Sequence, residues 1–304
     1  MIRVGFIGLG EAGLAMATGL SDVAAAHVVG YDILQDEPAV RAAAEQARVQ
    51  IVGSATALAA AADVVICLTS ASAAISIAEE VAPVLSSRHL YADYNSASPE
   101  LKWAVAAVVE PTGARFVDGA VMAAVSPARH QVPVLASGSG AEAFAAVGRE
   151  LEMRIEVIGD RPGDASAVKM FRSLLVKGLE ALVLECALGG ARYGVSERVF
   201  ASMGGSLPFE DWEALASYLI GRTVVHGERR AEELRQVATA LVGAGIEPWL
   251  AEAGAARLQW AVDHHLRERF GGVAPRRYQD VLRVLAEPGT TPLPPVQRRA
   301  MRMT

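Results

Sequence analysis

The sequence predicts an α/β protein in which a doubly wound, mostly parallel β-sheet precedes an all-α domain. Three observations support this fold class. Short apolar runs alternate with alanine-rich helical stretches through the first half of the chain, as in parallel βαβ units. Beyond about residue 160 only helical periodicity is found. The length of 304 residues is enough for two domains of moderate size.

Seven apolar runs in the first half are expected to form strands. Each is short, rich in β-branched or aromatic residues and bounded by Gly, Asp, Asn or Ser. The helical stretches between them supply the crossovers that parallel strands need. The expected strands are 2–8, 26–32, 63–69, 89–94, 114–121, 132–138 and 155–159.

The second half is expected to be helical throughout. The segment GDRPGD at 159–164 marks the change of pattern, and the Pro-rich, then basic, C-terminus is typical of a mobile tail. We therefore expect an α/β domain at 1–160, an all-α domain at 161–287, and a tail at 288–304. The expected helices are 167–194, followed by helices near 209–220, 223–243, 247–270 and 275–286.

Composition excludes several classes of protein. The chain is 52% hydrophobic and 20% charged, without an uncharged apolar run of 18 residues, so we expect a globular protein without a membrane span. A net charge of −6 argues against a nucleic-acid partner. Cys67 and Cys186 lie in apolar segments and are interpreted as buried, reduced thiols of a cytoplasmic protein. No metal-ligand spacing occurs, so no metal is expected.

The segment FIGLGEAGLAMATGL at 6–20 has the features of a phosphate-binding loop. Its apolar, small-residue character also resembles an export signal, but Glu11 and Asp22 interrupt the apolar run and Arg3 is a poor basic start. A strand precedes the G-x-G-x-x-G pattern and a helix follows it, as cofactor binding requires. Its glycines allow a tight turn, close approach of a pyrophosphate and helix–strand packing. The motif consists of Gly8, Leu9, Gly10, Glu11, Ala12 and Gly13.

Asp32 completes a dinucleotide site. It ends the second expected strand, 19 residues beyond Gly13, where an acid accepts hydrogen bonds from the adenosine ribose. The residues that follow, ILQDE, contain no arginine to hold a 2′-phosphate. The sequence therefore predicts an NAD(P)-binding Rossmann domain and favours NAD over NADP.

A second motif, GDASAVKM at 163–170, resembles the β-hydroxyacid dehydrogenase family, which includes 3-hydroxyisobutyrate and 6-phosphogluconate dehydrogenases. The resemblance covers nearly the whole chain in layout. It assigns the role of catalytic acid/base to Lys169, the position that matches the family lysine. It also places Asn95 and Ser96 beside nicotinamide and substrate, and with them we assign Thr69 and Ser70 to the cofactor site.

A base of this kind is also required by the chemistry, because hydride transfer from an alcohol leaves a hydroxyl proton to be accepted. Helical spacing places Arg172, Ser173, Lys177 and Glu180 on the same face as Lys169. We expect Arg172 and Lys177 to lower the pKa of Lys169 and to attract an anionic substrate. The alternative is a solvated basic face paired with Glu180.

The sequence departs from the family pattern near the expected substrate. Ser173 stands where one branch has Asn, and Val176 replaces the glutamate of oxidative decarboxylation, which argues against 6-phosphogluconate chemistry. Met122 replaces the serine of the Ser-Gly-Gly segment that binds the substrate carboxylate in the family. Ser126 is a candidate to compensate for that loss.

The segment HGERRAEEL at 226–234 resembles a less characterised subgroup with a divergent C-terminal domain. His226 and Arg229 or Arg230 form one basic helical face and are predicted to bind a substrate anion. Ion pairs of these arginines with Glu232 and Glu233 are the alternative.

These observations predict an NAD-dependent dehydrogenase of a small 3-hydroxy acid or related anionic alcohol, acting as a cytoplasmic homodimer with no nucleic acid or membrane partner. An imine reductase is one alternative, although such relatives usually lack the helix lysine. A non-catalytic dinucleotide sensor is a second alternative, which would bind NAD without turnover.

Overall fold

A computed structural model describes residues 1–203 and 211–286 of the chain. It divides into two compact units, Met1–Arg172 and Ser173–Thr304. The division falls inside a helix, some twelve residues beyond the sequence-predicted boundary at 160. The predicted tail at 288–304 lies outside the described residues.

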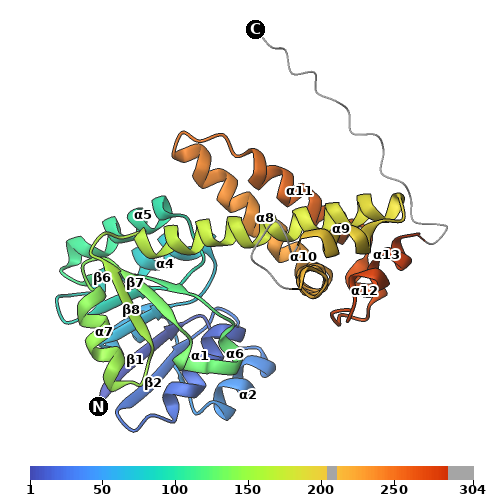
Figure 1. Ribbon diagram of the computed structural model, residues 1–304. Helices are drawn as coiled ribbons and strands as arrows, with labels where there is room; N and C mark the ends of the chain where they lie inside the picture. Colours follow the sequence, from blue (N-terminus) through green and yellow to red (C-terminus); the bar gives the residue numbers. More distant parts are fainter. Residues whose placement is uncertain (204–210, 287–304) are drawn as a thin grey trace. The chain divides into compact units, whose positions relative to one another are not determined.

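The first unit is built on an eight-stranded sheet of order β3-β2-β1-β4-β5-β6-β7-β8 (Figure 1). All neighbouring strands are parallel except β6 and β7, which are antiparallel. The seven predicted strands are present, and the structure adds the two-residue β3. The strands are β1 (Ile2–Ile7), β2 (Ala26–Tyr31), β3 (Gln50–Ile51), β4 (Val64–Cys67), β5 (Leu90–Asp93), β6 (Arg115–Val121), β7 (Val134–Ser137) and β8 (Ile155–Gly159).

Two apolar layers cover the two faces of this sheet. Side chains alternate along β1, so that Phe6 packs into one layer and Ile7 into the other. The first layer contains α1 and α7, and the second contains α3, α4 and α5. This arrangement confirms the predicted doubly wound fold. The helices of the unit are α1 (Glu11–Ser21), α2 (Pro38–Gln46), α3 (Ala55–Ala61), α4 (Ala74–Val81), α5 (Pro99–Val109), α6 (Val125–Ala128) and α7 (Ala141–Glu150).

The described part of the second unit is entirely helical, as predicted. The long helix α8 (Asp164–Arg192) begins three residues before the predicted start and continues from the first unit into the second. Gly194, with φ of +67°, follows its end, and the unpredicted α9 (Ser196–Ser202) comes next. The remaining helices are α10 (Trp212–Gly243), α11 (Trp249–Asp263), α12 (Leu266–Arg269) and α13 (Tyr278–Ala286).

Two predicted helix boundaries in this unit differ from those in the structure. The segments predicted as separate helices near 209–220 and 223–243 correspond to α10, in which two helical stretches meet at a kink at His226 (φ −124°, ψ 16°), so the predicted break is present but lies further along the chain. The predicted helix 247–270 is instead interrupted at His265, whose left-handed φ of +53° separates α11 from α12.

The cysteine prediction is half wrong. Cys67 is buried in the sheet, but Cys186 is exposed on α8, because its position falls outside the apolar stripe that packs in the second unit. None of the helices in the described ranges is long and apolar enough to cross a bilayer.

Candidate dinucleotide and substrate site

The candidate site is built at the carboxyl ends of the parallel strands. β1, β2, β4 and β5 run in the same direction and end at Ile7, Tyr31, Cys67 and Asp93. β1 lies between β2 and β4. The chain passes from β1 to β2 and β3 on one side, and then returns to β4 on the other side, so the strand order reverses at β1. Such a switch point forms the crevice in which open α/β sheets bind their ligands.

The glycine loop follows β1 at this switch point. Gly8 has a φ of +98°, which favours glycine. A Cβ at this position would collide with the carbonyl of Leu68, the residue that follows β4. Gly13 leaves no room for a Cβ against the Gly8 carbonyl, so α1 packs tightly on the loop. Both glycines are therefore required by the protein's own packing.

Gly10 differs from these two glycines. Its backbone (φ −66°, ψ −173°) suits any residue, and a Cβ added there would meet no heavy atom within 4 Å. Neither packing nor backbone strain explains a glycine at the N-cap of α1. The open space beside it fits a pyrophosphate that approaches the backbone at a helix N-terminus.

Gly10→Val is expected to leave the thermal midpoint within about 2 °C of the wild type. We expect it to raise the Kd for NAD about 30-fold, equivalent to about 2 kcal/mol, because the side chain would occupy the pyrophosphate position. Gly53→Val is a suitable control, since Gly53 also has open space around its Cβ position. Calorimetric titration with NAD checks this expectation, and unchanged affinity in Gly10→Val would contradict the placement of the phosphate.

Asp32 lies beside the glycine loop, directly after β2. One carboxylate oxygen accepts a hydrogen bond from the Leu9 amide (2.7 Å) and the other from the Leu34 amide (2.8 Å). These bonds hold the carboxylate against the loop, where an adenosine ribose would lie when the pyrophosphate is beside Gly10.

Asn95 connects the ends of β4 and β5. Asn95 is buried, and its side-chain oxygen accepts a hydrogen bond from the Thr69 backbone amide (2.7 Å). The backbone amide of Asn95 donates to the Asp93 carboxylate (2.9 Å). Ser96, Thr69 and Ser70 are exposed around it. Asn95 thus shapes the loop after β4, and the exposed neighbours are available to a ligand.

Lys169 lies on α8 between two residues that contact β6 and the residue just beyond it. Ser166, three residues before it on α8, donates to the Asp118 carboxylate of β6. Arg172, three residues after it, donates from Nη1 to the Met122 carbonyl just beyond β6 (3.0 Å). Residues three apart lie on the same side of a helix, so the half-buried Lys169 lies between two contacts to one strand.

The sequence analysis missed a set of buried charges beneath this helix. The Lys102 ammonium lies 3.2 Å from the Asp93 carboxylate and 3.5 Å from that of Asp118, and all three side chains are 0% exposed. A signal was present in the sequence, because the chain has 25 arginines but only three lysines, at positions 102, 169 and 177. In so arginine-rich a chain, a lysine is a candidate for a position that suits a compact ammonium better than a guanidinium.

Ser126, the candidate to replace the serine missing at Met122, contacts the glycine loop. Its hydroxyl donates to the Glu11 carboxylate of the glycine loop (3.0 Å). This bond ties the segment after β6 to the start of α1. Arg172 donates to the Met122 carbonyl and is a second polar group at this segment.

In the second unit, the charges on α8 and α10 form buried pairs. Arg230 is buried and makes a two-pronged ion pair with Glu180, and Arg222 lies 3.5 Å from the same carboxylate. Lys177 pairs with Glu233 at 2.9 Å. Burial raises the pKa of Glu180, and the neighbouring arginines oppose this shift. Burial also lowers the pKa of Lys177.

These pairs differ from the ion pairs that the sequence suggested. The partner of Arg230 is Glu180, fifty residues away, and not Glu232 or Glu233 on its own helix. Lys177 is neutralised by Glu233 and is not an open cation beside the predicted base. Substrate binding by Arg230 stays a prediction, while the geometry gives Arg230 a structural partner.

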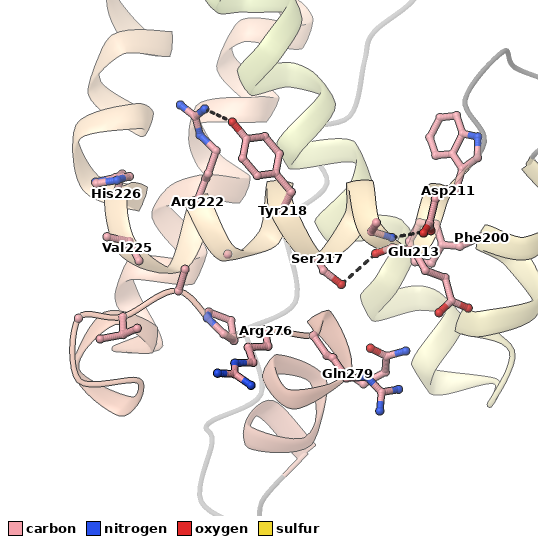
Figure 2. A pocket seen from close by; sticks show the side chains of 18 of the residues that line it. Phe200, Asp211, Glu213, Ser217, Tyr218, Arg222, Val225, His226, Arg276 and Gln279 are labelled. Carbon is pink, nitrogen blue, oxygen red and sulfur yellow. Dashed lines mark hydrogen bonds between the residues drawn. The ribbon is translucent and has the colours of Figure 1, made fainter. Parts of the chain in front are cut away.

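His226 lies at the irregular position of α10 and lines an open cavity of about 1110 Å³ (Figure 2). Partial desolvation and the positive charge of nearby arginines lower its pKa. The cavity is also lined by Asp211, Glu213 and Arg276, so both acidic and basic side chains border it. It does not single out one class of ligand.

The sheet order, the glycine loop and Asp32 together define an NAD(P)-binding protein of the Rossmann type. Comparison with known protein families supports this class. Residues 3–154 match the NAD binding domain of 6-phosphogluconate dehydrogenase, and residues 191–261 match a domain of unknown function, DUF1932.

Solved structures extend the similarity over both units. A conserved hypothetical protein of Sinorhizobium meliloti 1021 is 33% identical, with 94% of this chain and 96% of that chain covered and a TM-score of 0.82. A conserved protein of unknown function, described as structurally similar to 3-hydroxyacid dehydrogenases, is 28% identical over 90% of this chain and all of its own, with a TM-score of 0.73. The chain therefore belongs to the β-hydroxyacid dehydrogenase family, in a subgroup with a divergent C-terminal domain.

The fold also matches a characterised member of the family. The 3-hydroxyisobutyrate dehydrogenase of Mycobacterium tuberculosis, solved with L-serine, is 20% identical. The match covers 94% of this chain and 100% of that chain, with a TM-score of 0.72. At this identity the likeness concerns the fold alone.

Proposed function

We propose that this protein is an NAD-dependent dehydrogenase of a small 3-hydroxy acid or a related anionic alcohol, with Lys169 as the acid/base. The observation that carries the proposal is the position of Lys169 between the Ser166 and Arg172 contacts to β6. These contacts support a position for the Lys169 amine on the carboxyl-end side of the sheet, the side on which the glycine loop lies.

The reaction needs one base and one hydride acceptor. NAD, when bound beside the glycine loop, would supply the acceptor for the hydride of the carbinol carbon. The neutral amine of Lys169 takes the hydroxyl proton as the carbon–oxygen bond becomes a carbonyl. The products are the carbonyl compound, NADH and one proton, which Lys169 returns to solvent. In the reverse direction the Lys169 ammonium protonates the forming alkoxide.

Arg172 is the substrate-anion ligand that we propose for the first unit. Met122 lacks the hydroxyl of the family serine, and the Arg172 guanidinium lies at the same segment with one N–H donated to the Met122 carbonyl. The other guanidinium donors are suited to a carboxylate or phosphonate, which they bind in a forked geometry. Asn95, Ser96 and Ser173 are further proposed contacts to substrate or nicotinamide.

The proposed cofactor is NAD. The Asp32 carboxylate is held by two backbone amides and would repel a 2′-phosphate, while it can accept hydrogen bonds from ribose hydroxyls. Ile33 and Leu34 follow it, are exposed, and offer no cation to a phosphate.

The proposal is tested with a panel of hydroxy acids assayed with NAD and with NADP. The panel includes L-serine, 3-hydroxyisobutyrate and 3-hydroxypropanoate, with a cyclic imine assayed for reduction by NADH and NADPH. We expect turnover of at least one 3-hydroxy acid, with kcat/KM for NAD at least tenfold above that for NADP. Imine reduction without alcohol oxidation would support the reductase alternative, and NAD binding without any turnover would support the sensor.

We also propose that the protein acts as a homodimer through its second unit. Leu175 and Leu182 of α8 are 73% and 61% exposed, and Cys186 is exposed four residues further along the same side. Such an apolar stripe is suited to burial against a second copy. Sedimentation velocity would show a dimer for the wild type and a monomer for the Leu175→Glu, Leu182→Glu variant. A monomeric wild type would contradict the proposal.

A further inference from the structure

The start of α8 is fixed by a set of fully buried polar groups. We call Asp93, Lys102, Asp118 and Ser166 the buried clamp. They come from β5, α5, β6 and α8, and the side chains are at most 5% exposed. The site predicted from the sequence does not use Lys102.

The clamp contains two carboxylates but only one ammonium. Lys102 donates to the Asp93 carbonyl (2.7 Å) and lies within 3.5 Å of both carboxylates. A second buried carboxylate without compensation would be costly. Its compensation is the N-terminus of α8, where unpaired amides and the helix dipole favour negative charge.

The Asp118 carboxylate holds this N-terminus by two bonds to one residue. The Ser166 amide donates to one oxygen (2.9 Å) and the Ser166 hydroxyl donates to the other (2.7 Å). Because both bonds involve one residue, they fix the rotation of the helix as well as its position. The Ala165 amide donates to Ser137 (3.0 Å) and the Trp103 indole donates to the Pro162 carbonyl (2.7 Å), which secures the entry to the helix.

The clamp also reaches the predicted nicotinamide side of the site. The Asp93 carboxylate accepts a hydrogen bond from the Asn95 amide, and Asn95 holds the Thr69 amide. A continuous path of hydrogen bonds and ion pairs therefore runs from the loop after β4 to Ser166. Lys169 follows Ser166 by three residues, a rise of about 4.5 Å along the helix.

We propose that the buried clamp positions Lys169 relative to Asn95, so that the base and the nicotinamide-side loop keep a fixed separation. Lys102 and Ser166 are then positioning residues for the reaction, acting through the helix and not on the substrate. This inference rests on the proposed function of Lys169. It adds a role for buried groups outside the predicted site.

Ser166→Ala is the sharpest test, because it removes one of the two clamp bonds to the helix and preserves all the charges. We expect hydrogen exchange of the amides at 165–170 to become about tenfold faster, as measured by peptide mass spectrometry. We also expect kcat for the best hydroxy acid of the panel to fall about 10- to 100-fold, while KM for NAD stays within twofold. Ser166→Thr keeps the hydroxyl and is expected to restore both values to within threefold.

Ser54→Ala is the matched control. The Ser54 hydroxyl caps α3 by accepting the Ala57 amide (3.0 Å), so the same substitution removes a helix cap elsewhere in the unit. If Ser166→Ala matches this control in exchange at 165–170 and in kcat, the clamp inference is overturned. Lys102→Met serves as a second variant where it folds, and is expected to affect kcat in the same direction.

Failure of the proposed function has a different signature. If the wild type oxidises no hydroxy acid, the dehydrogenase proposal fails, and hydrogen exchange in Ser166→Ala still decides whether the clamp holds the start of α8. Unchanged exchange overturns the inference even when turnover is found.

Discussion

Replacing Lys169 by alanine is expected to lower kcat about 10²- to 10⁴-fold, the range that a positioned general acid/base contributes. NAD affinity should stay within twofold, because the glycine loop and Asp32 lie on other elements of the first unit. The folded state should be unaffected, since Lys169 is half-buried and its neighbour Ser166 provides the anchoring contacts. Steady-state kinetics with the best panel substrate and NAD titration measure the two quantities.

Val168→Ala provides a control in the same turn of α8, because Val168 is 46% exposed and has no proposed role in the chemistry. It should retain full activity. A Lys169→Ala enzyme with the turnover of the wild type would exclude Lys169 as the acid/base. Loss of NAD binding in this variant would instead indicate a structural role.

The second large effect is expected at the Glu180–Arg230 pair. Arg230→Met should destabilise the second unit by about 3–5 kcal/mol, because it leaves a fully buried carboxylate without its main partner. Arg222 lies 3.5 Å from the same carboxylate and offers partial compensation, which places the expected cost near the lower end. Denaturant unfolding followed by tryptophan fluorescence reports mainly on this unit, since three of the four tryptophans belong to it.

The double variant Glu180→Met, Arg230→Met separates pairing from burial. Removing both charges together should recover most of the lost stability, because an apolar pair needs no compensation. If Arg230→Met unfolds at the denaturant concentration of the wild type, the pair contributes nothing to stability. Arg230 would then be available for the anion-binding role that the sequence predicts.

The fold was predictable because its signals are local. Each expected strand is a short apolar run bounded by turn residues, and the sheet contains all seven of them within about two residues of the expected ends. The two-residue β3 is too short to show alternation. The antiparallel direction of β7 could not be read from its run, because a short apolar run has the same pattern in either direction.

The candidate site was only partly predictable for a related reason. Gly10, Asp32 and Lys169 stand in motifs whose spacing carries their meaning. The partners of the buried charges are set by tertiary structure: Asp118 meets Ser166 across 48 residues, and Glu180 meets Arg230 across 50. Local spacing offered Glu232 and Glu233 as nearer partners for Arg230, and helix packing between α8 and α10 decided otherwise.

The scarcity of lysine has a practical consequence for work with this protein. Lys102 and Lys177 are buried, so an acylating reagent meets Lys169 as the more open of the three side-chain amines, together with the chain's α-amino group. Reagents that modify surface lysines on most proteins would act here almost as site-directed inhibitors. Coupling through amines to a sensor chip or a fluorophore would attach the protein through its proposed base.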